Sequence, residues 1–179
     1  MTATARKPVH DPATPAVLVT PKVTARDLMM AEPFTVEAGA LVVDAAARMT
    51  ERGVSNAPVI RTDFTRKVLV GFISEKDVIQ CYASGRLYSQ PDLQVGEIMR
   101  EHPIGVRPEA DLFTLAAIFM QHGFRHLPVV VAGMLQGVVS RRDVLKGLLD
   151  HYASWRRQDP ATRKTPDMAG IFTPRYLLG

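Results

Sequence analysis

Cysteine is almost absent from this sequence: Cys81 is the one thiol among its 179 residues. A lone cysteine excludes an intramolecular disulfide framework and fits a reducing compartment. No His or Asn pattern accompanies it, so we interpret Cys81 as a half-buried helix residue and not as a catalytic nucleophile. The sequence also lacks the Cys-x-x-Cys and His-Glu-x-x-His patterns of zinc sites.

Long apolar runs are missing as well. No segment approaches the roughly 20 apolar residues that a membrane-spanning helix needs. The first residues, in which Arg6 and Lys7 precede Pro8, lack the apolar stretch of a secretory signal peptide. We therefore expect a soluble, cytoplasmic protein with no membrane partner. Apolar residues still make up 46% of the chain, which is enough for a substantial core.

The net charge of +4 belongs to the two ends of the chain. Residues 1–22 carry a net charge of +2 and residues 151–179 a net charge of +3, whereas the residues between them carry −1. Scattered prolines predict a mobile tail over 1–22 and exclude one long helix over 151–179. A folded basic face that follows a phosphate backbone is not indicated. An adaptor that binds nucleic acid or another anionic partner through these tails is the alternative function, and we do not favour it.

The sequence does contain an internal duplication. Residues 23–60 align with residues 93–130 at a constant offset of 70, and residues 71–77 align with 137–143 after a difference of four residues in one loop. A repeated unit usually cannot bury its apolar face alone, so the pair is the physical unit. We predict these parts in chain order: an N-terminal tail (1–22), a first repeat (23–83), a linker (84–91), a second repeat (92–150) and a basic C-terminal tail (151–179).

Both repeats show the same predicted order of elements, β-α-β-β-α, which indicates an α/β (α+β) fold packed as a pseudo-twofold pair. Apolar residues at i, i+3, i+4 and i+7 predict an amphipathic helix in each copy: Val42, Ala45, Ala46 and Met49, then Leu112, Leu115, Ala116 and Phe119. A glycine follows each helix as an expected left-handed cap. A hairpin comes next, with a tight turn at Ala132-Gly133 in the second copy and a turn spread over 61–67 in the first.

The junction between the last strand and the last helix of each repeat carries the chemistry. A glycine, a serine and an aspartate stand three residues apart in both copies: Gly71, Ser74 and Asp77, then Gly137, Ser140 and Asp143. A serine hydroxyl and the amides of a helix N-terminus suit an anion, and the preceding cation, Lys76 or Arg142, suits phosphate. The aspartate can accept hydrogen bonds from a ribose diol. The alternative without a ligand is that the serine caps the helix and the carboxylate complements its dipole.

The residues before the Pro-Val pair differ between the copies. Arg125 and His126 can reach a phosphate, whereas Ser55 and Asn56 at the same positions offer hydrogen bonds without charge. The structural alternative is that Arg125 and His126 line a solvated edge. This asymmetry predicts two unequal clefts.

The duplicated unit resembles a tandem pair of CBS domains, also called a Bateman module. The resemblance covers about residues 23–150. It depends on the two Gly-x-x-Ser-x-x-Asp segments, the Pro-Val pairs, and the triplets Asp27-Leu28-Met29 and Glu97-Ile98-Met99. It implies two clefts between the repeats that hold AMP, ADP, ATP or S-adenosylmethionine, and a homodimer formed through the helices. It places the base beside the first strand and the residue before proline. This chain departs from the family in having serine where many members have threonine.

We therefore expect a stand-alone regulatory module, not an enzyme, that binds an adenosine-containing ligand and relays this to an unknown protein target. We expect no catalytic domain beside the repeats, because each tail is too short for an enzyme fold. Gly123 separates His122 from His126, so we expect no metal site. The predicted ligand-binding residues are Thr35, Val36, Asn56, Ala57, Pro58, Ser74, Lys76, Asp77, Val106, Arg125, His126, Leu127, Pro128, Ser140, Arg142 and Asp143.

Overall fold

The computed structural model describes residues 23–161 and 164. The predicted N-terminal tail and most of the predicted C-terminal tail lie outside these residues. The elements follow in the order α1 (Ala25–Leu28), β1 (Val36–Glu37), α2 (Val42–Arg52), β2 (Asn56–Asp63), β3 (Arg66–Ser74), α3 (Glu75–Ala83), α4 (Arg86–Ser89), the 3-10 helix η1 (Val95–Glu97), β4 (Arg100–Glu101), α5 (Leu112–His122), β5 (His126–Val131), β6 (Met134–Ser140) and α6 (Arg141–Arg156).

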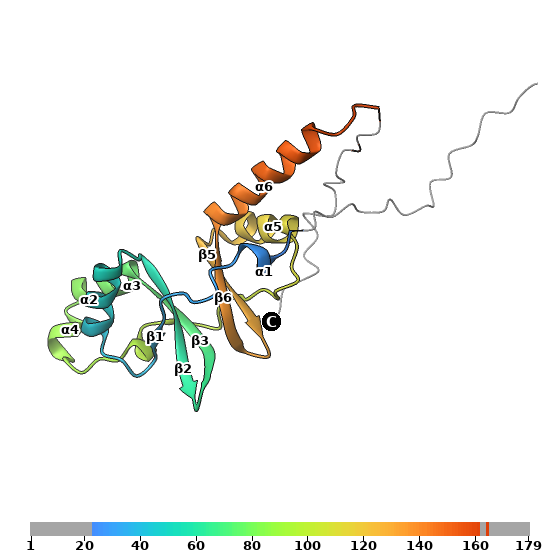
Figure 1. The fold of residues 1–179 in the computed structure, drawn as a ribbon. Helices are drawn as coiled ribbons and strands as arrows, with labels where there is room; N and C mark the ends of the chain where they lie inside the picture. Colours follow the sequence, from blue (N-terminus) through green and yellow to red (C-terminus); the bar gives the residue numbers. More distant parts are fainter. Residues whose placement is uncertain (1–22, 162–163, 165–179) are drawn as a thin grey trace, which may run out of the picture.

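Within the described residues, the strands form one six-stranded sheet in the order β1-β2-β3-β6-β5, with β4 pairing on β3. Its halves meet where Val68 of β3 lies opposite Met134 of β6, and the Leu69 amide donates to the Gly133 carbonyl at 3.0 Å. Helices α2, α3 and α4 gather at one end of the molecule, and α1, α5 and α6 gather at the other, with the strands between them (Figure 1). The prediction of two α/β repeats is confirmed.

Local sequence explains where the main helices begin and end. α2 and α5 stop at Gly53 and Gly123, whose φ angles of 61° and 64° are left-handed, as the repeat predicted. Ser74 and Ser140 are the N-cap residues of α3 and α6. The first hairpin differs from the prediction, because β2 continues to Asp63 and β3 begins at Arg66. Backbone pairing between β2 and β3 extends through these polar residues up to Asp63 and Arg66. Their polar side chains therefore do not indicate a wide turn.

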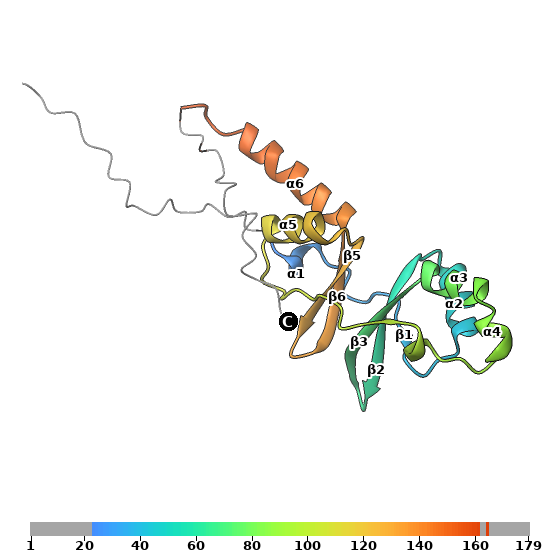
Figure 2. The same ribbon diagram turned by 180° about the vertical axis from the view of Figure 1, so that it is seen from behind.

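The first residues of each repeat pack on the other repeat. α1 lies beside α5 and α6 (Figure 2), and Ala25 belongs to the core of the second repeat. Leu93 and Val95 belong in turn to the core of the first repeat. The backbone bonds are equivalent too: the Ala25 amide donates to Ala110 at 2.8 Å, and the Val95 amide donates to Ala40 at 2.9 Å. The two halves have therefore exchanged their starting segments.

This exchange explains the two glycines within strands β3 and β6. A Cβ atom at Gly71 would lie 2.5 Å from Met99 Sδ, and one at Gly137 would lie 2.6 Å from the Met30 carbonyl oxygen. The sequence predicted a close approach at both glycines. The approaching group is the starting segment of the other repeat.

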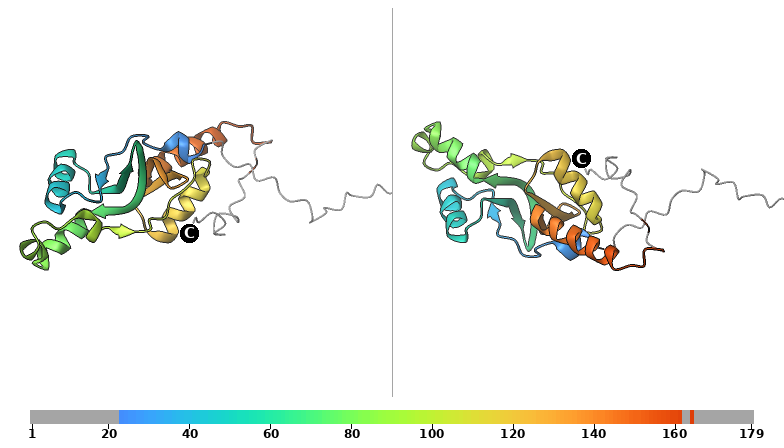
Figure 3. Two further views of the ribbon diagram at one scale, coloured as in Figure 1. Left: turned by 90° about the horizontal axis from the view of Figure 1, so that it is seen from below. Right: turned by 90° about the horizontal axis from the view of Figure 1, so that it is seen from above.

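α6 is longer than its counterpart α3. It spans sixteen residues against nine and continues to Arg156, so it projects beyond the body of the second repeat (Figure 3). The short helix α4 lies within the predicted linker.

Candidate functional site

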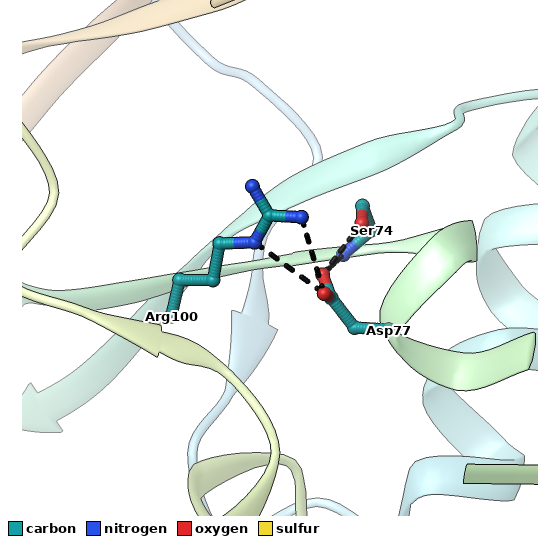
Figure 4. A network of polar contacts seen from close by, with 3 residues as sticks. All are labelled: Ser74, Asp77 and Arg100. Carbon is teal, nitrogen blue, oxygen red and sulfur yellow. Dashed lines mark hydrogen bonds and ion pairs between the residues drawn. The ribbon is translucent and has the colours of Figure 1, made fainter. Parts of the chain in front are cut away.

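The junction between β3 and α3 holds a charged network around Asp77 (Figure 4). The Ser74 amide donates to Asp77 Oδ2 at 2.9 Å, and the Ser74 hydroxyl donates to the same oxygen. Arg100 donates to the other oxygen, Oδ1, through Nε at 3.4 Å and Nη2 at 3.3 Å. The Asp77 side chain is 12% exposed and the Arg100 side chain is 61% exposed. One carboxylate therefore faces the helix cap with one oxygen and an exposed cation with the other.

The equivalent junction between β6 and α6 shares the cap but not the cation. The Ser140 amide donates to Asp143 Oδ2 at 2.9 Å, and the Asp143 amide donates back to the Ser140 hydroxyl at 3.2 Å. The position equivalent to Arg100 is Met30, seventy residues earlier. The capping role, which the sequence left open beside ligand binding, is present in both copies.

A cleft of about 640 Å³ opens between the two repeats at the first junction. Four chain segments line it: the start of β2, the end of β3 with the first turn of α3, the segment that crosses from the second repeat, and the end of α5 with the start of β5. The lining residues are Ser55, Asn56, Phe72, Ile73, Ser74, Glu75, Lys76, Asp77, Arg100, Glu101, His102, Pro103, Ile104, His122, Gly123, Phe124, Arg125, His126 and Pro128. Both repeats thus contribute to one cavity.

Asn56 and His126 meet at the inner end of the cleft. They occupy the same position in the two repeats, and Asn56 Nδ2 lies 2.9 Å from His126 Nδ1. The pseudo-twofold axis therefore passes between them. Burial lowers the pKa of His126 from its ordinary value of 6.5; Asp143 opposes this shift, and Arg125 and Arg141 add to it. A neutral His126 that accepts at Nδ1 fits the donation from Asn56.

Seven of the predicted ligand-binding residues line this cleft: Asn56, Ser74, Lys76, Asp77, Arg125, His126 and Pro128. Ser140, Arg142 and Asp143 lie at the second junction, outside it. The side chains of Val36, Ala57, Val106 and Leu127 are at most 2% exposed and pack in the two cores, where Pro58 is also buried. Thr35 is half-buried and does not line the cleft. These residues, which were expected beside the base, therefore do not line this cleft.

The amide of the first helical residue is not available to an anion, contrary to the simplest form of the sequence prediction. The Glu75 amide donates to the Ser55 carbonyl at 3.0 Å, and the Arg141 amide donates to Arg125 at 3.1 Å in the other repeat. These bonds fasten each helix start to the residue just before the strand that contains the Pro-Val pair. Because this first amide is occupied, the cations around the junction would have to neutralise an anionic group of a ligand.

Sequence reasoning missed the crossing segment from Arg100 to Ile104. In this segment the chain leaves η1 at Glu97 and pairs with β3 through Arg100 and Glu101. The aromatic side chains of Phe72 and Phe124, which line the cleft, were also not identified. One signal was present: Arg100 is a cation in a duplicated segment whose other copy has methionine.

Within residues 23–161 and 164, no group of three or more His, Cys, Asp or Glu side chains could hold a metal ion. His102, His122 and His126 all line the cleft, but they do not form such a group. No helix in the described part of the chain is both long and apolar enough to cross a membrane.

Two equivalent α/β repeats that exchange their starting segments and enclose a polar cleft define a paired module. The CBS domain matches residues 25–84 and 95–150, so the chain belongs to the CBS-domain family and carries two copies of the domain.

Similar proteins differ widely in length. The chain is 33% identical over 127 residues to the A-adding tRNA nucleotidyltransferase of Aquifex aeolicus, which matches 71% of this chain but 14% of the enzyme. It is also 33% identical over 118 residues to the uncharacterized 17.7 kDa protein of Acidianus ambivalens, covering 65% of this chain and 68% of that one. The crystal structure of CBSX2 in complex with AMP is similar with a TM-score of 0.63 and 28% identity, covering 72% of this chain and 98% of that one.

Proposed function

We propose that this protein is a regulatory CBS pair that binds an adenosine-containing ligand in the cleft at the first junction. The observation that carries the proposal is the cleft itself, because it brings Ser74 and Asp77 of one repeat together with Arg125 of the other. Its volume of about 640 Å³ lies within the usual range for small-molecule sites. The similarity to CBSX2, whose crystal structure contains AMP, supports the same ligand class.

The cations of the cleft support AMP, ADP or ATP over S-adenosylmethionine, although Glu75, Asp77 and Glu101 also line it. Lys76, Arg100 and Arg125 bring three cations to the cleft wall, and such cations suit phosphate oxygens. A sulfonium cation gains nothing from them. The apolar side chains of Phe72, Ile104 and Phe124 offer surfaces for the base, and Asp77 offers an acceptor for the ribose hydroxyls.

The arrangement also supports a relay to a protein target. A ligand in the cleft would contact both repeats, which the sheet joins where β3 meets β6, at Val68 and Met134, and where β4 pairs with β3. A ligand shifts such an equilibrium only if it binds one arrangement better than the other. We therefore propose that occupancy of the cleft changes the relative position of the repeats and that a partner responds to this change. We assign the chain no catalytic role.

Isothermal titration calorimetry with AMP, ATP and S-adenosylmethionine tests the binding. We expect AMP and ATP to bind, and Asp77→Ala to weaken AMP binding by about 10- to 100-fold, the size of hydrogen bonds to a charged group. Asp143→Ala is the matched control, because it removes the same capping carboxylate from the other junction. The absence of heat and of thermal stabilisation with all three compounds would contradict the proposal. Equal effects of the two variants would place the ligand elsewhere.

We also propose that the protein forms a homodimer through the last helix of each repeat, α3 and α6. α3 exposes Ile79 and Tyr82, and α6 exposes Leu145, Leu149 and Tyr152. The last three recur at i, i+4 and i+7 and so form one apolar stripe. Sedimentation velocity should show a dimer for the full chain and a monomer for the double variant Ile79→Asp, Leu145→Asp. A dimer that survives these substitutions would exclude this surface.

A further inference from the structure

Arg100 occupies the atom of Asp77 that a ribose would need. Asp77 Oδ2 already accepts from both the amide and the hydroxyl of Ser74. The remaining oxygen, Oδ1, accepts from Nε and Nη2 of Arg100 (Figure 4). A carboxylate oxygen has about two lone-pair sites, so an incoming diol must displace at least part of this contact.

The contact between Arg100 and Asp77 is weak enough to be displaced. Its nitrogen–oxygen distances of 3.3 and 3.4 Å exceed the ~2.7–2.9 Å of strong charge-assisted bonds. The Arg100 side chain is also 61% exposed, against 12% for Asp77, so water screens the cation's side of the pair. The guanidinium therefore holds Asp77 only loosely.

The backbone of Arg100 is fixed while its side chain is free to turn. Arg100 pairs with Phe72 in the sheet, and the preceding Met99 side chain packs against Gly71. The guanidinium shares the cleft wall with Lys76 and Arg125, the two cations suited to phosphate. When it leaves Asp77, it can turn toward a phosphate held there.

We propose that Arg100 makes the cleft prefer nucleotides over nucleosides. This inference rests on the proposed function and deepens it. In the free protein, Arg100 covers Asp77 Oδ1. A nucleotide takes over Asp77 with its ribose and receives the displaced guanidinium on its phosphate, and a planar fork suits that contact. A nucleoside must displace the guanidinium without offering it a new partner.

The test compares adenosine with AMP by calorimetry in Arg100→Met, which introduces the residue found at the equivalent position of the other repeat. We expect AMP to bind about tenfold more weakly, the loss of one charge-assisted contact. Adenosine should bind equally well or up to about fivefold more tightly, because an exposed ion pair no longer competes. Arg100→Lys should retain only part of the AMP affinity, because it keeps the charge but not the planar fork. Arg107→Met is the control, because it removes an exposed arginine outside the cleft lining. It should change neither the affinity for AMP nor the affinity for adenosine.

The outcomes separate this inference from the proposed function. If the wild-type protein binds neither adenosine nor AMP, both fail. If it binds AMP and Arg100→Met weakens adenosine as much as AMP, the residue supports the cleft without selecting phosphate, and the inference is overturned. Unchanged AMP affinity in Arg100→Met overturns it as well. A matching melting temperature for the variants and the wild type excludes loss of folding as the cause.

Discussion

The two strand-to-helix junctions share a cap and differ in what reaches it from the opposite repeat. In both junctions the serine amide and hydroxyl donate to the aspartate carboxylate, from Ser74 to Asp77 and from Ser140 to Asp143. Arg100 approaches the first aspartate, whereas Met30 stands at the equivalent position of the second. Duplication thus preserved the local device that starts each helix, and divergence of the exchanged segments made the surroundings unequal. The charge beside each junction is therefore set by a residue of the opposite repeat.

The largest expected effect concerns the two glycines against which the exchanged starting segments pack, Gly71 and Gly137. Gly137→Ala should lower the free energy of unfolding by about 3 kcal/mol and Gly71→Ala by somewhat less, as overpacked sites do. The Cβ at residue 137 would meet the Met30 backbone oxygen at 2.6 Å. At residue 71 the nearest atom is the sulfur of the flexible Met99 side chain at 2.5 Å, and the Arg100 backbone oxygen is farther away, at 2.9 Å. Urea unfolding measures the difference.

Gly39→Ala is the control for these substitutions, because a Cβ atom at this position would have nothing within 4 Å of it. It should change stability by less than about 0.5 kcal/mol. Equal midpoints for Gly137→Ala and Gly39→Ala would show that the crossing segments are not tightly packed.

A smaller effect is expected from the helix caps. Ser140→Ala should destabilise the protein by about 1 kcal/mol, the usual contribution of an N-cap hydroxyl. Ser74→Ala should destabilise the protein less, for two reasons. The Ser140 hydroxyl also accepts from the Asp143 amide at 3.2 Å. In the first junction, Asp77 keeps its contact with Arg100 when the Ser74 hydroxyl is removed. Thermal denaturation of the two variants compares the caps directly. A larger loss from Ser74→Ala would reverse this ranking.

The smallest expected effect is on the pH dependence of stability and concerns His126, which lies at the pseudo-twofold axis between the repeats. Burial lowers the pKa of His126 in the folded protein below its ordinary value of 6.5, so the unfolded chain takes up this proton first as the pH falls. The contribution of His126 to stability is therefore complete above about pH 6.5 and is lost as the pH falls below it. Asp143, Arg125, Arg141 and Asn56 face this group.

Denaturant unfolding between pH 7.5 and pH 5 checks this expectation. His126→Asn, which places the residue of the first repeat at the same position in the second, should show a shallower loss of stability on acidification. Identical pH profiles for the variant and the wild type would remove His126 as the cause.

The duplication predicted the repeated elements because each signal was local. A left-handed glycine after α2 and α5, or a serine before α3 and α6, depends on a few neighbouring residues. Within each repeat the junction lies beside the start of the strand that holds the Pro-Val pair, which is again a local arrangement. The meeting of residues from both repeats in one cleft is not local.

The exchange of the starting segments could not be predicted in this way. Leu28 and Met29 have the same apolar character as Ile98 and Met99, so either repeat could bury either segment with similar gain. Only the path of the chain between the repeats distinguishes the two packings. Arg100 was missed as a consequence, because its position beside Asp77 exists only in the exchanged arrangement.

The exchange also has a consequence for how the molecule can be divided. A fragment that ends after α3 would lack Leu93 and Val95, which complete its own core, and the remaining fragment would lack Ala25. Cutting the gene between the repeats therefore yields two incomplete polypeptides. Each would need the other to be present in order to fold, and co-expression is the way to recover them.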